Sequence, residues 1–342
     1  MGAIYVKVLL IMSVLFLFLV PGFILKKTGM IKDGGALSMS NVLLYVCQPA
    51  LVLKAFCVFS PEDYAVINAV DKGVLLKNFG LAGLISLVAL LAVFALCKLI
   101  FLRSKDKNVA NVFSYVAVFS NCGFVGIPFI QMFTDNNPVA VLYITVFNVV
   151  FNVLLWTLGV VLITGSVKEI SIKKIIFNPT LIACAVGLLI FFVPQINIFM
   201  MDGLKELQIF PSYLATMTAP LSMIIVGVRL AEMDFKALFC DWGVYFAGAL
   251  RLVVAPFITL LVALPFVALL GKGVASGFEE YVYLAPIIAM SMSPATAIVA
   301  MAEKFGGLKE KAAACVVLNT LLSIITIPLV TVAVYAILGI GI

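Results

Sequence analysis

Two short polar stretches interrupt apolar segments of this chain, and chemistry could occur at both of them. They are residues 120–128 (SNCGFVGIP) and residues 290–296 (MSMSPAT). A proline inside a helix removes a backbone donor and clashes with the preceding turn, but it suits the first turn of a new helix. Each stretch therefore predicts a broken helix, with new half-helices starting at Pro128 and Pro294. Within lipid, the freed backbone groups need protein or a water-lined cavity as partners.

Such breaks can bind an anion. Half-helices that run in opposite directions would bring two positive N-terminal ends together near mid-membrane, without any lysine or arginine. Glycines in the first stretch would let a backbone or a ligand approach closely. The candidate substrate-binding residues lie at these breaks, on the spans that follow them, or at the one charge within a span: Asn121, Gly123, Gly126, Pro128, Gln131, Asn148, Arg251, Ser291, Ser293, Pro294, Thr296 and Asn319.

Each of these candidates also has a purely structural interpretation. The prolines could only kink their helices, with the glycines serving helix packing. Asn148 and Asn319 could bind neighbouring helices rather than a substrate. The Arg251 side chain could extend to the cytoplasmic interface instead of facing a site.

The composition predicts the setting in which these residues act. The chain has 342 residues, of which 64% are hydrophobic and 11% are charged, far from a soluble domain. Its apolar runs of about 20 residues predict an all-α polytopic membrane protein. The net charge of +6 is scattered over the connectors, so no nucleic-acid partner is expected. Seven separate cysteines and no histidine give no metal site, and no cofactor is expected.

The apolar runs predict ten spans. They cover residues 4–26, 36–58, 75–100, 110–133, 138–164, 177–195, 211–231, 243–270, 281–302 and 312–338. Lysine and arginine concentrate in the connectors after the odd-numbered spans, which predicts that both termini lie on the non-cytoplasmic side of the cell membrane.

The two halves of the chain resemble each other in the spacing of special residues. Asn148 and Asn319 are 171 positions apart, as are Pro49 and Pro220, and 171 is half of 342. Five spans per half force the second half to insert upside down, so we expect a 5+5 inverted repeat. The expected halves are residues 1–164 and 165–342, with spans 4 and 9 as the broken pair.

Several segments resemble the auxin efflux carrier family along nearly the whole chain. They are residues 21–29 (PGFILKKTG), 41–51 (NVLLYVCQPAL), 120–128, 293–297 (SPATA) and 302–306 (AEKFG). The resemblance implies that spans 4 and 9 cross at their prolines. It also implies a transport bundle of spans 3–5 and 8–10, a scaffold of spans 1, 2, 6 and 7, and a homodimer. By the same resemblance, Asn121 contacts a substrate carboxylate, and short-loop members carry small carboxylates such as malate and malonate.

The function expected from both lines of reasoning is secondary transport of a small organic anion, a mono- or dicarboxylate or an auxin-like acid, by alternating access. H⁺ or Na⁺ remains open as the coupling ion, because no carboxylate lies in the middle of an expected span. Two alternatives stay open: a sodium-coupled symporter of the bile-acid type, which shares the crossover architecture, and a membrane sensor. An enzyme is not expected, since no catalytic constellation is present.

Overall fold

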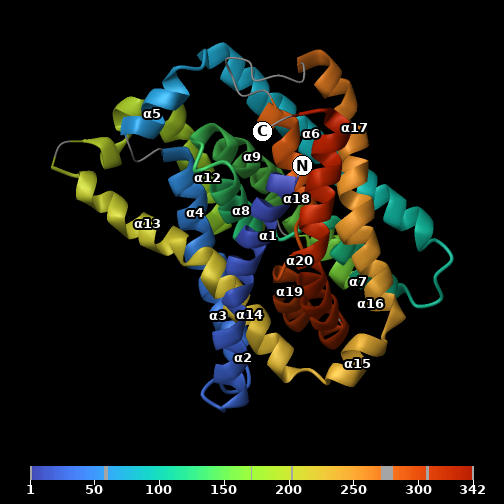
Figure 1. Cartoon of the computed structure of the whole chain (residues 1–342). Coiled ribbons are helices and arrows are strands. Elements are labelled where there is room, and N and C mark those ends of the chain that lie inside the picture. Colours follow the sequence, from blue (N-terminus) through green and yellow to red (C-terminus); the bar gives the residue numbers. More distant parts are fainter. Residues whose placement is uncertain are drawn as a thin grey trace.

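The computed structural model describes residues 2–57, 61–170, 172–201, 203–270, 280–305 and 308–340, whose regular secondary structure is helical (Figure 1). Seven helical runs in these residues are long and apolar enough to cross a membrane, and they match expected spans 1, 2, 3, 5, 7, 8 and 10. The runs are Gly2–Lys27, Gly35–Cys57, Lys72–Ile100, Pro138–Thr164, Lys205–Glu232, Trp242–Ala268 and Lys309–Leu338. The expected end of span 2 at residue 58 and the motif residue Gly306 lie outside the described residues.

The α-helices of the first half are α1 (Gly2–Leu17), α2 (Leu19–Lys27), α3 (Gly35–Val42), α4 (Gln48–Cys57), α5 (Pro61–Asn68), α6 (Lys72–Ile100), α7 (Lys107–Val118), α8 (Ile127–Phe133), α9 (Pro138–Leu154) and α10 (Val160–Thr164). Those of the second half are α11 (Ile172–Ile176), α12 (Pro179–Phe192), α13 (Ile209–Thr216), α14 (Thr218–Glu232), α15 (Phe235–Cys240), α16 (Trp242–Ala249), α17 (Ala255–Leu270), α18 (Glu280–Ser291), α19 (Ala297–Phe305) and α20 (Lys309–Leu338). Four π-helical turns join some of them: Leu43–Cys47, Cys122–Gly126, Leu155–Gly159 and Leu250–Val254.

The three other expected spans are not continuous long helices. Span 6 is represented by α12, which has 14 residues, fewer than the roughly 20 needed to cross a bilayer in one run. Span 4 consists of α7 followed by the helical run Cys122–Phe133, and span 9 consists of α18 followed by α19. Helical geometry is absent at residues 119–121 and 292–296, which overlap the start of the first stretch of unusual composition and most of the second.

Two sets of helices pack closely, and α1 joins them because it packs against α20 as well as α2 and α14. In one, α2 lies along α14 and α4 lies along α12 and α13. The α2–α14 contact is close because a Cβ atom at Gly22 would lie 2.1 Å from the Ile224 carbonyl oxygen, and one at Gly227 would lie 2.1 Å from the Leu19 carbonyl oxygen. In the other group, α6, α9, α17 and α18 pack together, and α20 packs against α16 and α19.

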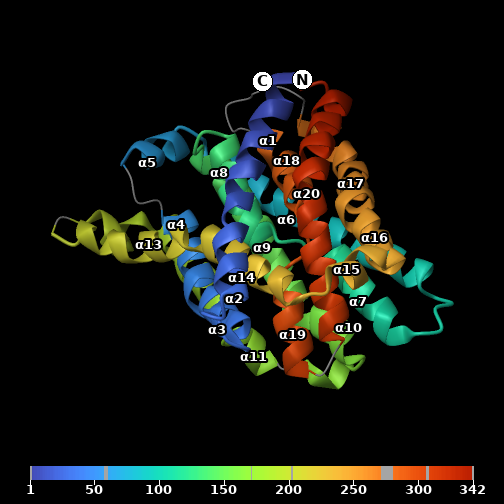
Figure 2. The same ribbon diagram turned by 60° about the horizontal axis from the view of Figure 1, so that its bottom comes forward.

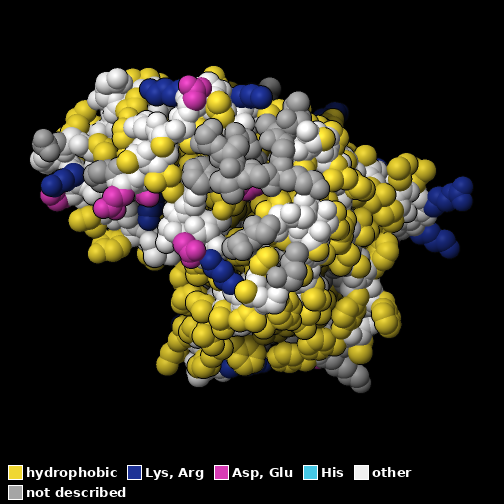
Figure 3. Space-filling model, turned by 45° about the horizontal axis from the view of Figure 1, so that its top comes forward, with side chains coloured by type: hydrophobic (Ala, Val, Ile, Leu, Met, Phe, Trp, Pro, Cys, Tyr) yellow, Lys and Arg dark blue, Asp and Glu magenta, His cyan; other side chains and the backbone are white. Residues whose placement is uncertain are grey.

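Both chain ends lie at the same end of the molecule, away from α2, α11 and α19 (Figure 2). Many large hydrophobic side chains are exposed on the outer surface. On the face shown in Figure 3, hydrophobic side chains cover most of the lower part, and charged side chains are few and lie higher or on a protrusion. This surface suits contact with lipid, in agreement with a polytopic membrane protein.

Candidate functional site

The two interrupted helices meet at their interruptions. Ser120 and Pro294 form an antiparallel β-bridge. The Asn121 backbone N–H donates to the Ser293 carbonyl oxygen at 2.7 Å, and the Ala295 N–H donates to the Phe119 carbonyl oxygen at 2.9 Å. Each extended segment thus satisfies backbone groups that the other leaves without helical partners, which is what a helix break in an apolar environment requires. We call residues 119–121 and 293–295 the crossover.

The two expected start points of the new half-helices differ from what is found. Pro294 lies in the crossover itself, and α19 starts three residues later at Ala297. Pro128 does not lie at a break, because helical structure already begins at Cys122 with a π-helical turn that runs into α8. Pro128 lies in the first turn of α8, directly after the wider π-helical turn Cys122–Gly126. A residue without a backbone N–H is tolerated in the first turn of a helix. The residue facing Pro294 is Ser120.

Polar side chains from both groups of helices surround the crossover. The Asn121 amide is 2% exposed and donates to Ser222 Oγ on α14 at 3.4 Å. Gln48, the first residue of α4, is buried beside it. The hydroxyl of Thr296 is buried without a hydrogen-bond partner among the described residues. The cavity lined by Gln48, Ser120 and Asn121 measures only about 10 Å³, room for about one water molecule.

Three buried amide side chains, from Asn148, Asn152 and Gln48, form a chain of contacts next to the helical run Cys122–Phe133. Asn148 Nδ2 donates to Cys122 Sγ at 3.5 Å, and Asn152 Nδ2 donates to Asn148 Oδ1 at 3.0 Å. Gln48 Nε2 in turn lies 3.5 Å from Asn152 Oδ1. A Cβ atom at Gly123 would lie 2.6 Å from Asn148 Nδ2, so this position needs glycine for close approach. Asn148 therefore packs against the first turn of the helical run Cys122–Phe133, directly after the crossover.

Gly126 is a further point of contact between the halves. A Cβ atom there would lie 3.3 Å from Met292 Cγ, which precedes the crossover in the second half. Ser293, by contrast, contributes through its carbonyl oxygen, which accepts from the Asn121 N–H.

Arg251 neither extends to an interface nor faces the small crossover cavity. Its side chain is fully buried on the π-helical turn Leu250–Val254. Nη1 donates to the carbonyl oxygens of Ala117 at 2.7 Å and Val118 at 3.1 Å, and Nη2 donates to that of Met290. These acceptors are the last two residues of α7 and the penultimate residue of α18, so one guanidinium caps two helix C-termini.

Three other candidates lie apart from the crossover contacts. Gln131 lines a separate cavity of about 370 Å³ together with Lys54 and Gln208. Asn319 Nδ2 lies 3.5 Å from the Val244 carbonyl oxygen on α16. The Ser291 hydroxyl donates to the Ile287 carbonyl oxygen of its own helix at 2.8 Å.

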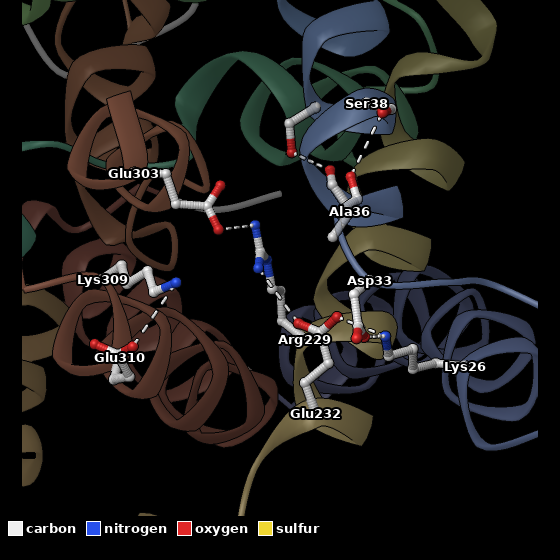
Figure 4. Close-up of polar contacts among 11 residues, drawn as sticks. Lys26, Asp33, Ala36, Ser38, Arg229, Glu232, Glu303, Lys309 and Glu310 are labelled. Atoms are coloured by element: carbon white, nitrogen blue, oxygen red, sulfur yellow. Dashed lines mark hydrogen bonds and ion pairs between the residues drawn. The ribbon is translucent and has the colours of Figure 1, made fainter. Parts of the chain in front are cut away.

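A larger cavity of about 710 Å³ opens among the charged ends of α14, α19 and α20. Arg229 lies between two carboxylates: its Nη1 is 3.3 Å from Glu232 Oε2, and its Nη2 is 3.0 Å from Glu303 Oε1 (Figure 4). Lys26 Nζ likewise lies 3.1 Å from Glu232 Oε1 and 2.8 Å from Asp33 Oδ1. This chain of alternating charges joins α2 and α14 to α19.

Two carboxyl groups at this end have lowered pKa values. The hydrogen bond from Lys26 holds the pKa of Asp33 below its ordinary value. Burial alone would raise the pKa of Asp241, but the hydrogen bond and charge of Lys311 outweigh it, so that pKa is lowered too. Both groups are therefore ionised at neutral pH and paired with a lysine.

A match to a known protein family identifies the family of this chain. A family model described as membrane transport protein matches residues 8–174 and again residues 163–331. The chain belongs to the auxin efflux carrier family. No curated protein sequence matches the chain. The auxin efflux carrier family consists of membrane transporters, and the apolar helices make this member a multi-pass membrane protein.

Gln48 and Ser222 lie beside the crossover of this auxin efflux carrier family member, although the sequence analysis did not predict them there. Both lie on helices that approach the crossover from outside the broken pair. A signal was present, since Gln48 directly precedes Pro49 and Ser222 follows Pro220 by two residues. Those two prolines are the pair separated by half the chain.

Proposed function

We propose that this chain is a secondary transporter of a small organic anion that binds at the crossover and moves by alternating access. Asn121 supplies an amide donor to the substrate carboxylate, and Thr296 supplies a hydroxyl from the other half. The N-terminal ends of Cys122–Phe133 and α19 add backbone donors and positive dipole ends. Mono- and dicarboxylates such as malonate, malate and indole-3-acetate are the substrates to test first.

The observation that carries this proposal is the pairing of the two interrupted helices around buried polar groups. Kinked helices would keep their helical hydrogen bonds, whereas residues 119–121 and 293–295 leave helical geometry and pair with each other, as two half-helix ends can. The buried Thr296 hydroxyl supports this proposal because it lies next to the crossover and has no hydrogen-bond partner among the described residues.

The size of the crossover cavity supports alternating access. A cavity of about 10 Å³ is too small to hold a carboxylic acid. A substrate would need Gln48 on α4 and Ser222 on α14 to withdraw from Asn121. We therefore propose that α1–α4 and α12–α14 form the scaffold, and that α6–α10 and α16–α20 form the transport bundle that slides or rocks against it.

The finer architecture belongs to the same proposal. Ten spans in two inverted halves, with α7 to α8 and α18 to α19 as the broken spans, are supported by the location of the crossover and by the double family match. We further propose a cell-membrane homodimer with both termini outside the cytoplasm, driven by H⁺ or Na⁺. A sodium-coupled symporter would show uptake that requires a sodium gradient, and a sensor would bind without flux.

The direct test is the variant Asn121→Ala. It removes the amide that reaches Ser222 but leaves the backbone bond to Ser293 intact, so the fold should survive. Uptake of a transported acid into proteoliposomes should fall at least about tenfold, the scale of one lost hydrogen bond to a charged group. Unchanged uptake by the folded variant would reject the role of Asn121.

A further inference from the structure

Arg251 is a buried charge whose partners are helix ends. Its side chain has no exposed surface, and among the described residues it forms no ion pair with a carboxylate. Its Nη atoms instead donate to carbonyl oxygens of Ala117, Val118 and Met290. Burying an arginine without compensation is strongly unfavourable, so these carbonyls must supply its counter-charge.

The charge balance of this arrangement is simple. The C-terminal end of a helix carries about −0.5 of an elementary charge on carbonyls that lack intrahelical donors. Because α7 and α18 both end beside Arg251, their two ends together match its single positive charge. Without Arg251, two like-charged helix ends would lie side by side in an apolar interior.

The other two helix ends at the crossover are N-terminal ends, which carry positive partial charge. The helical runs Cys122–Phe133 and α19 begin there, and each contributes about +0.5 of an elementary charge. With all four ends present and no arginine, the positive and negative ends would largely cancel. With Arg251 capping the negative pair, the crossover keeps a net positive potential.

We propose that Arg251 is the residue that determines the site's selectivity for anions, acting through the two helix ends rather than by touching the substrate. This inference rests on the proposed function, because it concerns what the same crossover site accepts. It differs from direct binding, because Nη1 and Nη2 already donate to carbonyl oxygens at the C-terminal ends of α7 and α18.

The test compares charged and neutral ligands of the same shape. Malonate and malonamide, and indole-3-acetate and indole-3-acetamide, are measured for flux into proteoliposomes and for thermal stabilisation of the protein in detergent. Arg251→Met removes the charge, and Arg251→Lys keeps it. Arg103→Met is the matched control, because it makes the same change at an exposed connector residue.

We expect Arg251→Met to lower the preference for the anion over its amide by about tenfold to a hundredfold, the range given by one charge acting on two helix ends. Arg251→Lys should keep most of the preference, and Arg103→Met should keep all of it. A folded Arg251→Met protein with the wild-type preference would overturn the inference. So would equal losses for the anion and the amide, which indicate a merely structural role.

The remaining outcomes are also decisive. If Arg251→Met does not fold, a folded Arg251→Lys that has lost the preference rejects the inference, and one that retains it supports the role of charge. If neither variant folds, Arg251 serves the fold alone and the selectivity role is withdrawn. If malonate stabilises the wild-type protein but no flux is measured, the transport proposal is rejected. The preference for anions over amides can then still be compared between variants by thermal stabilisation. A wild type that prefers the amides rejects both.

Discussion

The ion pair between Arg229 and Glu303 connects the proposed scaffold to the proposed transport bundle, and its removal should change how they move. Arg229 lies on α14 and Glu303 on α19, with Nη2 and Oε1 3.0 Å apart (Figure 4). If α14 and α19 separate during each transport cycle, this bond must break each time. Glu303→Gln weakens the bond with little change in shape, so it should favour the separated conformations.

The expected size follows from the burial of the pair. The Arg229 and Glu303 side chains are 14% and 19% exposed, which places them between a surface pair and a core pair. Exposed pairs contribute roughly 0–1 kcal/mol, and hydrogen bonds to charged groups roughly 1.5–3 kcal/mol. We expect a coupling of about 1–2 kcal/mol, which shifts a two-state equilibrium by about 5- to 30-fold.

Thiol labelling gives a direct assay. Val299 is 4% exposed and lines the cavity beside Glu303, so a cysteine introduced there should react faster when the cavity opens. The labelling rate of Val299→Cys should rise about 5- to 30-fold in Glu303→Gln, by the same coupling energy. A double-mutant cycle with Arg229→Gln isolates the pair from the separate contact of Arg229 with Glu232.

The control is Glu310→Gln, the same substitution on the same cavity. Glu310 is 82% exposed, and its closest approach to Lys309 is 3.9 Å, so it should leave the labelling rate unchanged. The reasoning is refuted if Glu303→Gln and Glu310→Gln label alike. It is also refuted if the cycle gives a coupling energy below about 0.5 kcal/mol, the usual additivity error.

Three further outcomes are expected. Gly123→Ala should destabilise the protein by about 1–3 kcal/mol, because the new Cβ would lie 2.6 Å from the Asn148 amide. Gly80→Ala is the control and should not destabilise the protein, because a Cβ there has open space; thermal unfolding measures both variants. Gln48→Leu should weaken binding of a transported acid, and equal affinity in isothermal titration would speak against its role at the crossover. Lys311 lowers the pKa of Asp241 from its ordinary value in the folded state. Asp241→Asn should therefore lower the melting temperature at pH 7 and have a smaller effect at pH 3; an effect independent of pH would contradict the pairing with Lys311.

Much of the fold could be predicted from the sequence because apolar run length is a local property. Seven of the ten expected spans are helical runs of sufficient length and hydropathy. The positions of the interruptions could be predicted to within several residues from unusual composition. The exact residues of the interruptions could not be predicted, because the break at residues 119–121 depends on backbone hydrogen bonds to residues 293–295, which are far away in the chain.

Some candidate site residues could be predicted from the sequence, and others could not. Asn121, Ser293 and Pro294 could be located from the stretches that contain them, since those stretches form the crossover. Arg251 could not be assigned from sequence, because its partners are backbone carbonyls of two other helices. Asn148 and Asn319 occupy similar sequence settings, yet one packs directly after the crossover and the other packs against α16.

The most direct test of the account is uptake of labelled malonate, malate and indole-3-acetate into proteoliposomes containing wild-type protein or Asn121→Ala. Measurements with imposed proton or sodium gradients also identify the driving ion. The account predicts saturable uptake of at least one acid by the wild type and its loss in the folded variant. Absence of flux for every acid, together with clear ligand-induced thermal stabilisation, would contradict transport and indicate a sensor.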